Sequence, residues 1–146
     1  MLLKDLIGMP YERGGKTPGT HDCRSLFIEV MNRFDNKVSV PDIEQTAIED
    51  VVAAHARGEY PYSQSDSGIV NRELGSGKWQ KLDEPEIGCA VCIALDPYHP
   101  DLIQHLGVYI GSNKFIHTLE RHGVMTSRVN DLYFRRKIRG YYKWKK

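Results

Sequence analysis

Cys23 is the residue of this sequence best placed for nucleophilic chemistry. Asp22 suits a helix N-cap, and the apolar side chains that follow repeat at helical spacing, which predicts a helix from about Cys23 to Phe34. A cysteine in the first helical turn meets the positive end of the helix dipole and unpaired amide groups, which stabilise a thiolate and can hold an oxyanion. A small buried residue where a helix enters the core fits the position equally well, so position alone leaves both interpretations open.

Two histidines on a predicted hairpin favour the chemical interpretation. Alternation from His105 to Ile110 puts His105 on the face opposite the apolar side chains, and Gly111-Ser112-Asn113 supplies the turn before the chain returns to His117. The two histidines are equidistant from Gly111, so a hairpin folded there would oppose them directly, with Cβ atoms about 5 Å apart. They share a face only if the loop holds an odd number of residues. A base oriented by a second polar group is the arrangement that a thiol nucleophile needs.

Helices come first in the predicted order of elements and strands come second. Helical segments are expected at residues 2–8, 23–34, 41–57 and 66–74. Strands are expected at residues 89–95, 102–110, 114–118, 124–128 and 137–143. This order predicts one α+β domain, residues 1–146, whose N-terminal helices precede a C-terminal antiparallel sheet.

Charge and cysteine content narrow the function classes. The formal net charge of +1 predicts no general attraction to nucleic acid or to a membrane, and no stretch reaches transmembrane length. The segment from Arg135 to Lys146 contains seven basic residues and no acidic one, which favours an anionic polymer, although a solvated terminal strand explains it as well. Three cysteines without a secretory signal make a disulfide framework improbable.

The spacing Cys89-x-x-Cys92 raises the question of a metal or redox site, with His99 as a third ligand. Residues three apart on a strand point to opposite faces, so the two thiols cannot hold one ion without a bulge. The chain has no second C-x-x-C to complete a tetrahedral set. We therefore expect no metal site and no cofactor.

The ordered combination of these segments resembles the NlpC-type peptidases, which are bacterial cell-wall cysteine endopeptidases with a reduced papain-like fold. The resemblance rests on the segments Gly8-Met9-Pro10-Tyr11-Glu12-Arg13-Gly14-Gly15, Asp22-Cys23, His105-Leu106-Gly107-Val108-Tyr109-Ile110-Gly111 and Phe115-Ile116-His117. It implies that Cys23 is the nucleophile, His105 the general base and His117 the residue that orients this base. It also implies that Tyr11 lies near the nucleophile and donates a hydrogen bond to the oxyanion or the substrate.

The resemblance further implies a substrate, the bond between γ-D-glutamate and a diamino acid in the peptidoglycan stem peptide. Arg24 and Ser25 replace the small pair that usually follows the nucleophile, so Arg24 is expected to contact a substrate carboxylate or to narrow the site, with Asp22 and Ser25 as further substrate contacts. Cys89 stands where an acidic residue often follows the glycine that starts the first strand of the family's sheet. These departures bear on substrate detail more than on the chemistry.

Two other functions fit the same residues. An acyltransferase or amidase would use the same cysteine and histidine but pass the acyl group to an amine or alcohol, and a non-enzymatic binding or structural module would keep the fold with a silent site. Because the sequence carries no recognisable export signal, delivery by a phage tail or release by phage lysis is expected.

Overall fold

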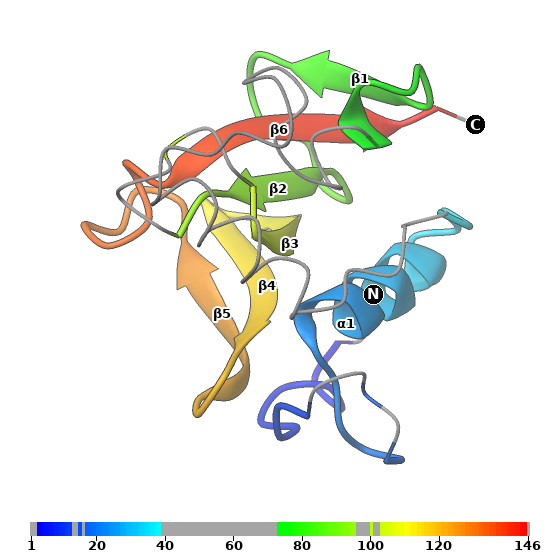
Figure 1. The fold of residues 1–146 in the computed structure, drawn as a ribbon, viewed down its shortest axis with the longest axis vertical. Helices are drawn as coiled ribbons and strands as arrows, with labels where there is room; N and C mark the ends of the chain where they lie inside the picture. Colours follow the sequence, from blue (N-terminus) through cyan, green and yellow to red (C-terminus); the bar gives the residue numbers. More distant parts are fainter. Residues whose placement is uncertain are drawn as a thin grey trace, which may run out of the picture.

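The computed structural model describes residues 3–12, 15, 17–38, 73–95, 100 and 103–145. The described part comprises α1 (Cys23–Arg33), β1 (Trp79–Leu82), β2 (Ala90–Ile93), β3 (His105–Gly111), β4 (Lys114–Leu119), β5 (Gly123–Arg128) and β6 (Ile138–Trp144) (Figure 1). The six strands form one sheet in the order β1-β6-β2-β3-β4-β5, and every neighbouring pair is antiparallel. The predicted α+β class with an antiparallel sheet is therefore confirmed.

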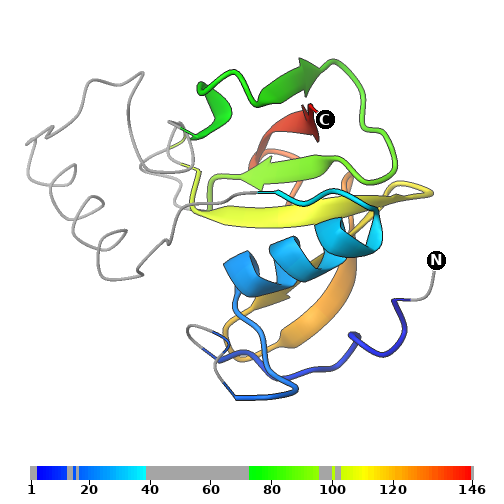
Figure 2. The same cartoon turned by 90° about the vertical axis from the view of Figure 1, so that its right-hand side faces the viewer.

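α1 forms where the sequence predicts it, because its signals are local. Asp22 is the N-cap, Phe34 is the C-cap, and the helix buries the apolar stripe Leu26, Phe27, Val30 and Met31. This stripe packs against β3 and β4, and Figure 2 shows α1 lying along these two strands. The packing sets the first turn of α1, with Cys23, beside the sheet.

Two apolar clusters cover the two faces of the sheet. The cluster under α1 takes alternate residues of each strand, among them Cys92, Leu106, Val108 and Ile116. The opposite face is covered by a second cluster, in which Phe134 packs with Cys89, Tyr109 and Phe115. Cys89 and Cys92 thus lie on opposite faces and are both buried, as the strand period of two predicts.

The structure corrects two predictions at the level of elements. Residues 4–8 form consecutive turns rather than a helix, and the segment pairs with β5 through Gly8 N–H to Val124 O at 2.9 Å and Val124 N–H to Met9 O at 2.9 Å. Strand β1 was not predicted, since only four residues carry it and a single buried side chain, Trp79, marks its inner face. The helix predicted at 41–57, most of the one at 66–74, and His99 lie outside the described residues. None of the described helices is both long enough and apolar enough to cross a membrane.

The β3–β4 hairpin differs in register from the prediction. Ser112 and Asn113 alone form the turn, with φ of 54° and 61°, and Gly111 pairs with Lys114. A bulge at Ile110 then shifts the pairing so that Val108 faces Ile116. The two-residue turn has the left-handed conformations of a type I′ turn, which matches the twist of hairpin strands. The direct opposition predicted for the two histidines is therefore wrong by two residues.

Candidate active site

A capping box holds the start of α1. The backbone N–H of Ser25 donates to Asp22 Oδ1 at 2.7 Å, and the backbone N–H of Asp22 donates to Ser25 Oγ at 3.0 Å. His21 Nδ1 also lies 3.0 Å from Ser25 Oγ. Asp22 and Ser25, predicted as substrate contacts, are thus engaged in holding the turn that carries Cys23.

The loop before α1 brings Tyr11 next to the helix start. Tyr11 forms an isolated parallel bridge with His21, and the N–H of Glu12 donates to His21 O at 3.2 Å. Gly15 packs directly on Ser25, because a Cβ added at Gly15 would lie 2.5 Å from Ser25 Oγ. Tyr11 is therefore fixed beside a residue only two positions before Cys23. Arg24 is half-buried in the same turn.

Cys23 begins α1, which packs on β3 and β4. Tyr109 N–H donates to the carbonyl oxygen of Cys89, the residue before β2, so alternation directs the N–H of Leu106 toward the β4 side. The matched pairs of β3 and β4 stop at Val108 and Ile116, and the Leu106 amide acts to lower the pKa of the Cys23 thiol. The start of α1 therefore lies near the peptide unit that joins His105 to Leu106.

His105 and His117 form a buried hydrogen-bonded pair on the sheet. His105 Nε2 lies 2.8 Å from His117 Nδ1, and the ring centroids are 5.1 Å apart. The two histidines share a face although the turn holds two residues, because the bulge at Ile110 adds one more, and they meet as diagonal neighbours rather than as directly opposed residues. The ring nitrogen of His105 that His117 does not occupy is Nδ1.

Gly107 permits this diagonal approach. A Cβ at Gly107 would lie 3.4 Å from the Cβ of His117 and 2.7 Å from Cδ2 of the Phe115 ring. Gly107 is thus the residue directly opposite His117, and any side chain there would push against both Phe115 and the histidine. Because Gly107 has no side chain, the His117 ring can extend diagonally across it to reach His105.

Ser127, which was not predicted from the sequence, continues the contacts of the pair. Ser127 Oγ on β5 lies 2.7 Å from His117 Nε2, so three side chains form one hydrogen-bonded row from His105 to Ser127. Phe115 and Phe134 pack on the His117 ring, with centroids 4.6 and 5.1 Å away. A single serine in a strand matches no sequence motif. Only the pairing of β4 with β5 shows that Ser127 is the hydrogen-bond partner of His117.

Burial makes all three central groups neutral at rest. It raises the pKa of the Cys23 thiol to about 11, and the Asp22 carboxylate adds to this, while amide bonds from Leu106 and Arg24 oppose it. Burial lowers the pKa of His105 to about 3, with a further contribution from His117, and lowers the pKa of His117 to about 4. Amides at the helix terminus act to lower the pKa of the thiol, but burial of the sulfur outweighs them, so the free protein holds a thiol rather than the thiolate expected from the sequence.

Acid is expected to destabilise the fold through these histidines. Both folded-state pKa values lie below the ordinary value of 6.5. At a pH between the folded-state value and 6.5, the unfolded chain therefore binds more protons than the folded protein. The free energy of unfolding should therefore fall as the pH drops below about 6.5, by up to about 1.4 kcal/mol per pH unit for each histidine. Urea unfolding at about pH 7 and about pH 5 measures this. His117→Asn should lose less stability over that interval than the wild type, and equal losses would contradict the assignment.

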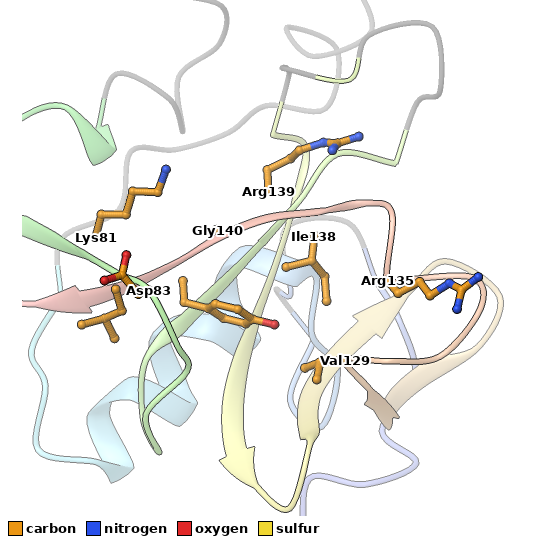
Figure 3. Close-up of a pocket in the computed structure, with 9 residues that line it drawn as sticks. Lys81, Asp83, Val129, Arg135, Ile138, Arg139 and Gly140 are labelled. Atoms are coloured by element: carbon orange, nitrogen blue, oxygen red, sulfur yellow. The ribbon is translucent and has the colours of Figure 1, made fainter.

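A pocket lies away from Cys23, where β1 and β6 meet the turn after β5. This pocket has a volume of about 320 Å³, and its charged lining residues are Lys81, Asp83, Arg135 and Arg139. Figure 3 shows the side chains of Lys81, Arg135 and Arg139 extending in different directions, and Val129 and Ile138 add apolar side chains to the lining. All four charged residues are exposed, and the cations outnumber the single carboxylate.

The cysteines of the C-x-x-C spacing lie apart from any cluster of metal-ligand side chains in the part of the chain that the structure describes. Within the described ranges, no group of three or more His, Cys, Asp or Glu side chains is arranged to hold a metal ion. Cys89 and Cys92 are free thiols, and burial raises the pKa of Cys89 to about 11.

A model of the NlpC/P60 family matches residues 8–143 of the chain. Among solved structures, the fold is similar to NlpC2 from Trichomonas vaginalis, with 18% identity, a TM-score of 0.59, and coverage of 96% of this chain and 44% of that one. It is also similar to a protein of Staphylococcus aureus subsp. aureus Mu50 described as similar to lipoprotein, NLP/P60 family, with 17% identity, a TM-score of 0.55, and coverage of 94% and 37%. The chain spans less than half the length of either protein.

Proposed function

Because the chain belongs to the NlpC/P60 family, we propose that it is a cysteine peptidase that hydrolyses amide bonds in peptidoglycan stem peptides. Membership of this family supports a cell-wall hydrolase activity in general. The observation that carries the proposal for this chain is the packing of α1, which begins at Cys23, on β3, the strand that begins at His105 and holds the first member of the histidine row.

The protonation states support general-base activation rather than a resting ion pair. His105 is neutral at physiological pH, and its Nδ1 is the ring nitrogen left to accept the thiol proton as the sulfur attacks the amide carbonyl. Amides at the start of α1 stabilise the oxyanion, with Tyr11 as a further donor. The protonated His105 then gives its proton to the leaving amine, and the acyl group stays on sulfur as a thioester. Water, deprotonated by His105, attacks the thioester and releases a carboxylic acid and the free thiol.

The finer specificity follows the charges around Cys23. We propose the bond between γ-D-glutamate and the diamino acid as the one cleaved, with Arg24 pairing with a carboxylate of the stem peptide. Arg24 is half-buried in the first turn of α1, immediately after the nucleophile, so a bound carboxylate would lie close to the reacting carbonyl.

Digestion of purified peptidoglycan in ¹⁸O-enriched water tests the function. Mass analysis should show released peptides with a new terminal carboxyl that carries ¹⁸O, and a free amine on the diamino acid. Acyl transfer to an added amine, without ¹⁸O in the products, would instead identify a transferase. Intact peptidoglycan after prolonged incubation would favour a non-enzymatic module and contradict the proposal.

The basic pocket is expected to assist contact with anionic wall polymers. Replacing Lys81, Arg135 and Arg139 with glutamine should weaken binding to purified cell walls, and wild-type binding should weaken as ionic strength rises, because exposed charges are screened over about 8 Å at physiological salt. A matched control replaces the exposed Lys4, Lys37 and Lys114, which removes the same charge elsewhere. Equal wall binding by the two triple variants would show that binding depends on net charge and not on the position of these residues in the pocket.

Delivery to the wall by a phage tail or by phage lysis stays a prediction. Its check is the position of the gene, which we expect beside tail or lysis genes. A position among metabolic genes would contradict it.

A further inference from the structure

Ser127 ends the hydrogen-bonded row that begins at His105. His105 Nε2 lies 2.8 Å from His117 Nδ1, and His117 Nε2 lies 2.7 Å from Ser127 Oγ. Each neutral imidazole carries one proton, so each nitrogen-to-nitrogen or nitrogen-to-oxygen contact in the row has a definite donor and acceptor. The direction of the whole row therefore depends on what its last member does.

The two possible directions have opposite consequences for His105. If Ser127 Oγ accepts from His117 Nε2–H, then His117 Nδ1 is bare and accepts from His105 Nε2–H, which leaves His105 Nδ1 without a proton. If Ser127 instead donates to His117 Nε2, then His117 Nδ1–H donates to His105 Nε2, and the proton of His105 moves to Nδ1. Only the first direction lets His105 Nδ1 accept a proton from Cys23.

We propose that Ser127 is a positioning residue whose Oγ accepts the Nε2–H of His117 and so holds both histidines in the tautomers that leave His105 Nδ1 free. This inference rests on the proposed function of His105 as a base, but its structural part concerns proton positions alone.

The burial of His117 makes its hydrogen bond to Ser127 important for the tautomer of its ring. His117 has an exposed fraction of 0% and is packed by Phe115 and Phe134, so a ring N–H without an acceptor there would stay unsatisfied. Within the described part of the chain, the polar partners of the His117 ring are His105 and Ser127. Ser127 is only half-buried and lies on β5, the edge strand of the sheet, so its own hydroxyl proton has access to water. A serine at this position can therefore accept from the histidine without losing a partner for its own proton.

Loss of the Ser127 hydroxyl should reverse the donor and acceptor roles in the hydrogen-bonded row, or leave a mixture of both directions. With no acceptor at Nε2, His117 would gain by carrying its proton on Nδ1, where His105 Nε2 can accept it. That change puts the proton of His105 on Nδ1, the nitrogen that must accept the proton of Cys23. The expected loss is in kcat rather than in KM, because substrate contacts are untouched while the fraction of competent enzyme falls.

A pair of variants isolates the hydroxyl. Ser127→Thr keeps it and Ser127→Val removes it, while the two side chains have nearly the same shape, so a difference between them reports the hydroxyl and not the packing. Ser127→Ala adds a smaller replacement in case the branched side chains unfold the strand. Thr126→Ala on the same strand is the control, since Thr126 is exposed and its side chain points to the other face.

Two readouts test the proposal in the full chain. Nitrogen-15 NMR of labelled histidines should show Nε2 protonated and Nδ1 bare for both His105 and His117 in the wild type, in Ser127→Thr and in Thr126→Ala. Ser127→Val and Ser127→Ala should show the reversed or mixed pattern, with kcat lower by about 10- to 100-fold. An unchanged nitrogen pattern in Ser127→Val and Ser127→Ala would overturn the proposal. Because the tautomers are read without substrate, an inactive wild type would refute the proposed function without deciding this one.

Discussion

Cys23→Ala is expected to abolish hydrolysis of peptidoglycan peptides, by at least about 10⁴-fold, while the protein stays folded. The reason is chemical, since alanine offers no atom that can form the thioester through which the proposed reaction proceeds. The fold should survive because Leu26, Phe27, Val30 and Met31 attach α1 to the sheet and Asp22 caps it without the sulfur. Peptide release by mass analysis gives the rate, and a urea unfolding curve verifies the fold.

Cys89→Ala is the matched control for the loss of a thiol. Cys89 is buried in the cluster on the opposite face of the sheet from α1, so its loss should lower stability modestly and leave the rate unchanged. A rate in Cys23→Ala comparable to that of the wild type would remove Cys23 as the nucleophile.

His105→Ala is expected to lower the rate by on the order of 10²–10⁴. The thiol pKa of about 11 leaves almost no thiolate at neutral pH, so the reaction depends on a base that takes the proton during attack. The loss should therefore shrink as the pH rises toward that pKa, where solvent hydroxide forms the thiolate without help.

His122→Ala provides the comparison for His105→Ala, because His122 is exposed in the turn between β4 and β5. It should retain wild-type activity over the same pH range. A His105→Ala rate within a few-fold of the wild type at neutral pH would exclude His105 as the base.

Local signals account for the parts that the sequence predicted correctly. The N-cap at Asp22, the apolar stripe of α1 and the alternation of the strands each involve residues a few positions apart, and the strands predicted at 89–95, 102–110, 114–118, 124–128 and 137–143 all appear with shifted ends. The family was also identified correctly, because its segments occur in order along the chain.

Tertiary contacts account for what the sequence did not predict. The bulge at Ile110 and the two-residue turn shifted the histidine pair from opposed to diagonal, and neither has a clear signal beside the expected turn glycine. Ser127 meets His117 only through the pairing of β5 with β4. The raised pKa of the Cys23 thiol comes from desolvation in the folded chain, which no spacing of residues reveals.

Covalent labelling with a stem-peptide analogue tests the central claim most directly. The probe is a γ-D-glutamyl peptide that carries a thiol-reactive group in place of the scissile amide, and the readout is peptide mapping by mass spectrometry together with residual activity. We expect one probe per protein, attached to Cys23, with loss of activity in proportion to labelling and with slower labelling in His105→Ala. The buried Cys89 and Cys92 should stay unmodified. Full activity after complete modification of Cys23, or inactivation through a different residue, would contradict the account.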